Sequence, residues 1–181
     1  QYWGATEPTR VNFWRHWVFA SPAWDWWSFD FDRHLADADE KIGRLVDQVN
    51  PDLSAFKARG GKAIVYQGWQ DPVVNAIDTI AYYERVRARQ GSQQEIDRFF
   101  RLFMVPGMGH CGGGEGPNTF DMMAPLEEWV EHGHAPSRVV ASHSTNGTVD
   151  RTRPLCAYPA VARHTGTGST DAAENFVCRL P

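Results

Sequence analysis

The chain has 181 residues, of which 42% are hydrophobic and 22% are charged, and its formal net charge is −4. This length suffices for one domain with a hydrophobic core, and the charge balance provides no basic field of the kind that nucleic-acid binding requires. No apolar run approaches the roughly 20 residues that a membrane-spanning helix needs. We therefore expect a globular protein that binds neither nucleic acid nor membrane.

The first 49 residues are unusually aromatic. The chain opens at Gln1 without Met or a signal-like apolar run, which predicts a mature or cut N-terminus. Eight aromatic residues then fall between Trp14 and Phe31 without helical spacing, so the rings are expected to pack together or to line a pocket, with packing favoured. Nearby aspartates lack the glycine-centred spacing of a calcium loop and are interpreted as a solvated acidic face: Asp30, Asp32, Asp37 and Asp39.

From Asn50 onward the sequence alternates between helical and strand-like segments. Asn50-Pro51 is typical of a helix start and Gly60-Gly61 of a helix end. Short apolar runs at 63–66 and 100–105 are typical of buried strands. Two further helices are expected. One spans 76–89, with its inward side chains at Ile77, Ile80, Tyr83 and Val86. The other ends at Gly133, with its inward side chains at Met122, Leu126, Trp129 and Val130.

This order of elements predicts an α/β fold with a parallel sheet. Val139–Ala141 is expected to form a last edge strand. After residue 145 the chain is rich in Gly, Thr, Pro and Arg, which predicts a surface tail held, if at all, by cysteines. Asn146 begins a glycosylation sequon, which is a weak pattern.

Two titratable residues follow the two predicted strands. Asp71 comes after the first strand and His110 after the second. Because catalytic groups gather at the carboxyl ends of parallel strands, we expect the pair to act as the orienting carboxylate and the general base of a Ser-His-Asp triad. Their order also fits an α/β-hydrolase, in which Asp precedes His.

The alternative interpretation of both residues is structural. Asp71 precedes a proline and could simply open a turn, and His110 could be a surface histidine in a flexible loop. The glycines from Gly107 to Gly114 favour the catalytic interpretation, because they let the backbone bring the imidazole back over the sheet edge. No His-x-x-x-His or Cys-x-x-Cys pair is present, so the sequence predicts no metal site.

The nucleophile of such a triad is missing. The chain contains no Gly-x-Ser-x-Gly elbow, and Ser142 and Ser144 follow His110, which is the wrong order. We therefore expect the nucleophile to lie outside this chain. Three cysteines cannot all pair within one chain, which leaves either an external partner or three reduced thiols in a cytosolic protein.

Several longer motifs resemble one family. They are NPDLSAF at 50–56 leading to GGK at 60–62, GWQDP at 68–72, FRLFMVPGMGHC at 100–111 and RPLCAYP at 153–159. Together they resemble the tannase and feruloyl esterase family, which includes bacterial hydrolases of aromatic esters such as terephthalate esters. The match extends through most of the chain.

The resemblance implies a secreted or periplasmic serine esterase of gallate-, hydroxycinnamate- or phthalate-type esters. It implies that residues 50–181 are the C-terminal part of an α/β-hydrolase core and residues 1–49 the last stretch of a lid domain. Asp71 and His110 match the family's triad, Cys156 and Cys178 match a disulfide, and Cys111 matches a cysteine bonded beside the serine, here in an N-terminal partner segment. The family's calcium site would lie in the missing part of the lid.

Without its serine this chain alone is expected to be inactive. A non-catalytic binding or assembly module on the same scaffold is the alternative.

Overall fold

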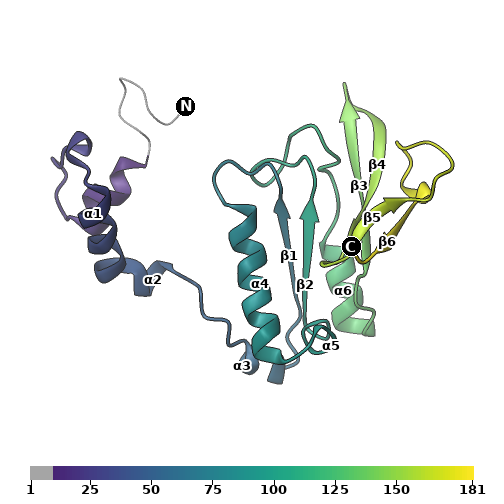
Figure 1. The fold of residues 1–181 in the computed structure, drawn as a ribbon, viewed down its shortest axis with the longest axis horizontal. Coiled ribbons are helices and arrows are strands. Elements are labelled where there is room, and N and C mark those ends of the chain that lie inside the picture. Colours follow the sequence, from purple (N-terminus) through teal and green to yellow (C-terminus); the bar gives the residue numbers. More distant parts are fainter. Residues whose placement is uncertain (1–9) are drawn as a thin grey trace. The chain divides into compact units, whose positions relative to one another are not determined.

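The structure, a computed structural model, describes residues 10–181, which divide into two compact units. The first unit runs to Val49 and the second from Asn50 to Pro181. Figure 1 shows helices in the first unit and both helices and strands in the second. That the first unit is the end of a lid domain stays a prediction.

The first unit is built from short helical segments around a cluster of aromatic rings. Ring centroids lie 4.7 Å apart for Trp14 and Phe29 and 4.8 Å apart for Phe19 and Trp24, so these rings pack together as expected. Trp17 and Trp27 remain 60% and 71% exposed. The segments are η1 (Phe13–Val18), η2 (Trp26–Ser28), α1 (Phe31–Ala38), η3 (Asp39–Gly43) and α2 (Arg44–Val46).

One residue of the acidic stretch has a structural role at the start of α1. The Asp30 carboxylate accepts hydrogen bonds from the backbone N–H groups of Asp32 and Arg33, both at 2.9 Å. These bonds satisfy two of the donors that a helix start leaves free. They also hold the pKa of Asp30 below its usual range.

The first helix of the second unit begins later than predicted. α3 spans Ser54–Ala58 rather than starting at Asn50. The Asn50 side chain instead accepts a hydrogen bond from the Asp52 N–H, and the Asp52 carboxylate accepts one from the Ser54 N–H. These two local turns compete with helical geometry and delay the helix.

A parallel pair of strands forms the centre of this unit. β1 (Ala63–Gly68) pairs with β2 (Phe100–Val105), so that Gly68 lies opposite Val105. The crossover between them contains α4 (Ala76–Gln90) and α5 (Gln93–Ile96). The Asn75 side chain caps the start of α4, and Gly91, with φ of +91°, ends it.

The two faces of the parallel pair contribute to different core clusters. Leu102 packs with Tyr83 and Val86 of α4, whereas Phe103 and Val105 pack with residues from the C-terminal strands. α6 (Met123–His132) buries Trp129. The predictions for two other residues were wrong, since Ile77 is 56% exposed and Val130 is 60% exposed.

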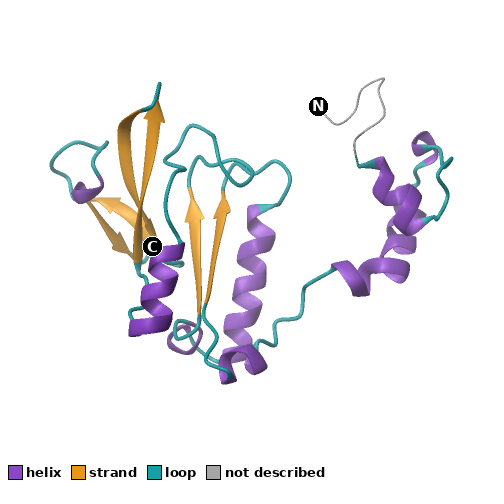
Figure 2. Ribbon diagram, turned by 180° about the vertical axis from the view of Figure 1, so that it is seen from behind, coloured by secondary structure: helices purple, strands orange, loops and turns teal. Residues whose placement is uncertain are grey.

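The predicted surface tail is also wrong, because the chain after residue 145 forms strands (Figure 2). β3 (Arg138–Thr145) and β4 (Thr148–Cys156) form an antiparallel hairpin, and β5 (Val161–His164) pairs with β6 (Phe176–Arg179). The expected edge strand is thus part of β3 and pairs with β4. Leu155 and Ala157 are 2% and 7% exposed and complete one of the core clusters.

The turn of the β3–β4 hairpin consists of Asn146 and Gly147. Both have positive φ, 51° and 80° respectively. Asn-Gly favours this two-residue hairpin turn, because both residues tolerate the left-handed region. The dipeptide is therefore a hairpin signal as well as the start of the sequon.

The C-terminal strands are joined covalently. A disulfide connects Cys156 of β4 to Cys178 of β6, with their Cα atoms 5.6 Å apart, as the family resemblance implied. Within residues 10–181, no helix combines the length and apolar character needed to cross a membrane.

Candidate active site

The loops that follow β1 and β2 are bonded to each other at the carboxyl ends of the strands. The Trp69 N–H donates to the carbonyl of Val105, and the Gln70 N–H donates to the carbonyl of Met108, both at 3.0 Å. β1 and β2 point in the same direction, so both loops leave the same edge of the sheet (Figure 1). The loop containing Asp71 and the loop containing His110 are therefore held together by backbone contacts.

Gly68 permits this close approach. A Cβ atom at this position would lie 2.4 Å from the carbonyl oxygen of Met108 and 2.6 Å from that of Gly109. Both neighbours are backbone atoms and cannot move aside as a flexible side chain could. Only glycine lets the two loops meet at this distance.

Asp71 is buried and its carboxylate is surrounded by hydrogen-bond donors. One oxygen accepts from the N–H groups of Val73 and Val74, at 2.7 and 2.9 Å, and its side chain is 4% exposed. Burial by itself raises the pKa of this carboxyl, but hydrogen bonds from Val74, His110 and Val73 outweigh burial and hold the pKa well below its usual range. Asp71 is therefore an ionised acceptor.

Gln67 is a second buried polar group that supports Asp71 and that the sequence analysis missed. Its amide nitrogen donates to Asp71 Oδ2 at 3.1 Å and to the Val74 carbonyl at 3.3 Å. Its amide oxygen accepts from the Thr79 hydroxyl at 3.2 Å. The available signal was a single glutamine at the end of an otherwise apolar strand.

His110 lies against the same carboxylate. Its Nδ1 is 2.8 Å from Asp71 Oδ2, and its side chain is 46% exposed. Because an ionised carboxylate can only accept, we assign the proton to Nδ1 of His110, which leaves Nε2 as the acceptor. The imidazole is thus oriented on one side and open to solvent, as a general base must be.

The loop that contains His110 is compact. Gly107 has a φ of +76°, and Gly116 passes so close that a Cβ on Gly107 would lie 2.7 Å from the Gly116 backbone. Met108, the residue after Gly107, is 1% exposed and packs in the core with Val105. The buried Met108 anchors the loop, so that the neighbouring histidine is held in place by packing as well as by hydrogen bonds.

Cys111 directly follows the histidine and is exposed. It is unpaired within the described part of the chain and has a φ of +61°. Among residues 10–181, no serine hydroxyl is in hydrogen-bond contact with His110, and Ser142 donates instead to the Thr119 carbonyl. The described residues therefore bring an imidazole and a buried carboxylate together, without a serine hydroxyl in hydrogen-bond contact with the imidazole.

Two other histidine arrangements are structurally distinct from this pair. His132 and His134 both contact the Glu128 carboxylate near the end of α6, and His143 contacts Asp150 on the β3–β4 hairpin. No group of three or more metal-binding side chains occurs in residues 10–181.

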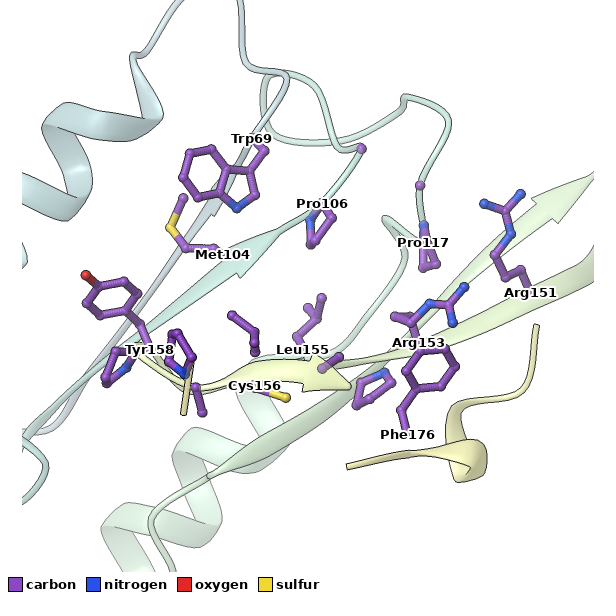
Figure 3. Close-up of a pocket in the computed structure, with 18 of the residues that line it drawn as sticks. Trp69, Met104, Pro106, Pro117, Arg151, Arg153, Leu155, Cys156, Tyr158 and Phe176 are labelled. Atoms are coloured by element: carbon purple, nitrogen blue, oxygen red, sulfur yellow. The ribbon is translucent and has the colours of Figure 1, made fainter. Parts of the chain in front are cut away.

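Two hollows lie near these loops. One of about 280 Å³ is lined by Asp71 and by neighbours such as Trp69 and Ile77. The other, of about 630 Å³, has neither Asp71 nor His110 in its lining (Figure 3). The smaller hollow is adjacent to the candidate chemistry, and the larger one shares Trp69 with it but not Asp71.

Comparison with known proteins gives a consistent result. A family model described as "Tannase and feruloyl esterase" matches residues 15–179. An uncharacterized esterase of Xanthomonas campestris is 40% identical over 194 residues, covering 87% of this chain and 34% of the relative. The mono(2-hydroxyethyl) terephthalate hydrolase of Piscinibacter sakaiensis is 47% identical over 136 residues, covering 74% of this chain and 22% of the relative.

A solved structure shares the architecture. The crystal structure of feruloyl esterase B from Aspergillus oryzae superposes with a TM-score of 0.87 at 27% identity, over 97% of this chain and 38% of that protein. This match confirms the expected α/β fold class. The chain spans only about a fifth to two fifths of the length of these proteins.

Proposed function

The chain belongs to the tannase and feruloyl esterase family, and from this premise we propose that it supplies the general base and the orienting carboxylate of a serine carboxylic-ester hydrolase. His110 is the base and Asp71 the carboxylate. One observation carries the proposal: a buried, ionised Asp71 holds Nδ1 of a half-exposed His110 at 2.8 Å, where two parallel strands end.

The proposed reaction is a two-step acyl transfer. A serine outside this chain attacks the ester carbonyl while Nε2 of His110 takes its proton, and His110 then protonates the departing alcohol. In the second step His110 takes a proton from water, which attacks the acyl-serine, and returns the proton to the serine. Asp71 keeps the imidazole in the required tautomer and stabilises its charged form.

The substrate class follows from the relatives. Their names specify feruloyl and terephthalate esters, which supports an aromatic-acid ester as the substrate here. The aromatic first unit is, on this proposal, the end of a lid domain. A calcium site belongs, on this proposal, to the remainder of that lid.

The remaining assignments concern the rest of the protein. Cys111 is exposed beside His110, which supports a disulfide to a cysteine in an N-terminal part of the same enzyme. Such a disulfide would place the protein in the secreted or periplasmic class. The 181 residues alone would then have no esterase turnover, because they lack a nucleophile.

The test is the substitution His110→Ala in the complete protein. Hydrolysis of methyl ferulate and methyl gallate should fall by about a thousandfold or more in kcat/KM. His132→Ala is the matched control, because His132 also contacts a carboxylate but lies near the end of α6. Activity that survives His110→Ala, or that falls equally in both variants, would refute the proposal.

A further inference from the structure

The larger hollow, which we call the β4 cavity, extends along β4 between β2 and β6 and has a volume of about 630 Å³. This lies within the usual range for small-molecule sites, roughly 300–1,000 Å³. Figure 3 shows two arginines, Arg151 and Arg153, toward one end and the side chains of Trp69, Met104 and Tyr158 toward the other. The cavity is therefore positively charged at one end and largely apolar and aromatic at the other.

Arg153 contacts an aromatic ring rather than a carboxylate. Its guanidinium lies over the ring of Phe176, 4.1 Å from the centroid, and forms no ion pair within residues 10–181. Asp171 attracts this guanidinium without forming an ion pair with it. Arg151, by contrast, lies 3.6 Å from Asp171 and donates to the Glu115 carbonyl. Partial burial and the neighbouring Arg151 lower the pKa of Arg153 and outweigh the attraction of Asp171, which raises it, but a guanidinium stays charged in proteins. An unpaired, partly desolvated cation remains in the cavity wall.

The walls are fixed before any ligand binds. The Cys156–Cys178 disulfide ties β4, which carries Arg153, to β6, which carries Phe176. The Thr152 N–H donates to the Asp171 carbonyl at 2.8 Å, next to Arg153. Preformed walls reduce the entropy lost on binding.

From this arrangement we propose that the β4 cavity binds an aromatic monocarboxylate. The carboxylate would form a two-pronged ion pair with Arg153, as the planar guanidinium geometry favours. The ring would lie on the apolar side between Leu155, Met104 and Tyr158. The lining contains one carboxylate, Glu115, and one guanidinium without an ion pair, Arg153. A ligand with one negative charge therefore suits the cavity better than a ligand with two.

Such acids are also the products expected of the proposed esterase. The inference does not require that activity, because the cavity lining contains neither Asp71 nor His110. Binding and catalysis can therefore fail separately.

The experiment is hydrogen–deuterium exchange of the complete protein with sodium benzoate as the probe and benzamide as its neutral analogue. Benzoate should protect the backbone amides of 151–158, and benzamide should need a concentration about tenfold or more higher for equal protection, because a charged hydrogen bond is lost. Since this comparison uses the unaltered protein, it does not depend on whether a variant folds.

Variants then locate the carboxylate. Arg153→Gln should raise the half-protecting benzoate concentration by about tenfold or more, with Arg153→Lys intermediate. Arg163→Gln on β5 should leave it unchanged, because that exposed arginine lies outside the cavity lining. Protection confined to the His110 loop, equal protection by benzamide, or equal binding by the Arg153→Gln protein would each overturn the assignment.

Discussion

Asp71 and His110 differ sharply in exposure, with side chains 4% and 46% exposed. The buried carboxylate is fixed by donors from Gln67, Val73 and Val74 as well as from His110. Among residues 10–181, the imidazole has one hydrogen bond, to Asp71, and its second nitrogen is left open. This asymmetry suits a pair in which one member stays ionised and the other exchanges protons.

Asp71→Asn tests the orienting role directly. The amide preserves the side-chain shape but no longer accepts the Nδ1 proton in the same way, so kcat should fall by about a thousandfold or more with a smaller change in KM. Asp78→Asn, an exposed acid in the first turn of α4, is the control and should retain turnover. Near-normal turnover of the Asp71→Asn protein would mean that Asp71 is only a turn residue.

The depressed pKa of Asp71 also predicts a pH dependence of stability. The pKa is lower in the folded state, so the stabilisation is fully present above the ordinary pKa of about 3.9 and is lost as pH falls through the folded value. The gap between wild-type and Asp71→Asn unfolding midpoints in urea should therefore narrow as pH falls below about 4. A gap that widens as pH falls below about 4 would contradict the assignment of an ionised, hydrogen-bonded Asp71.

At the level of elements, the site depends on how closely the loops after β1 and β2 approach. Their contact is made by backbone atoms at Gly68, Met108 and Gly109. The hydrogen bond from Gln70 to Met108 holds the same junction. The relative position of acid and base is thus set by the strand register and by one glycine.

Gly68→Ala should disrupt this junction. The new methyl group would lie 2.4 Å from a backbone oxygen, and the required shift should cost about 1–3 kcal/mol of stability. It should also lower kcat/KM by more than any rise in KM accounts for, which means that kcat falls. Gly112→Ala, in the loop that Gly68 contacts, is the control, because nothing lies within 4 Å of its added methyl group. Thermal unfolding and kinetics of both variants check this, and equal effects would argue against a special role for Gly68.

On the scale of the whole molecule, the chain matches one part of a longer architecture. It covers 38% of the Aspergillus oryzae feruloyl esterase B structure that it superposes on. The C-terminal strands are secured by their own disulfide, and a closed loop of this length stabilises the folded state by about 3 kcal/mol in the chain-entropy model. Cys111 is the remaining thiol and lies beside the base.

Non-reducing peptide mapping of the complete protein tests this connection. Cys156 should be recovered bonded to Cys178, and Cys111 bonded to a cysteine outside residues 1–181. The external link would fix the base relative to the nucleophile's loop more tightly than packing alone. Recovery of Cys111 as a free thiol, or bonded to Cys156 or Cys178, would remove the proposed connection and the secreted assignment with it.

The sequence alone determined the local features of this protein. Apolar runs defined β1 and β2, glycines defined helix ends, and the motifs around Asp71 and His110 identified the family, because each depends on residues close together in the chain. Periodicity was less reliable for orientation: it placed Ile77 and Val130 inward, whereas both are exposed.

Only the tertiary structure decided which distant segments meet. The composition of the C-terminal stretch predicts a surface tail, but Leu155 and Ala157 complete the core. Their burial depends on the pairing of β4 with β3 and on a bridge between Ala157 and Phe103. The role of Gln67 was likewise invisible, because it depends on the turn after β1, which brings Asp71 and then Thr79 of α4 back to its side chain. The long-range contacts of Leu155 and Ala157 are set by packing and strand pairing, which no local pattern encodes.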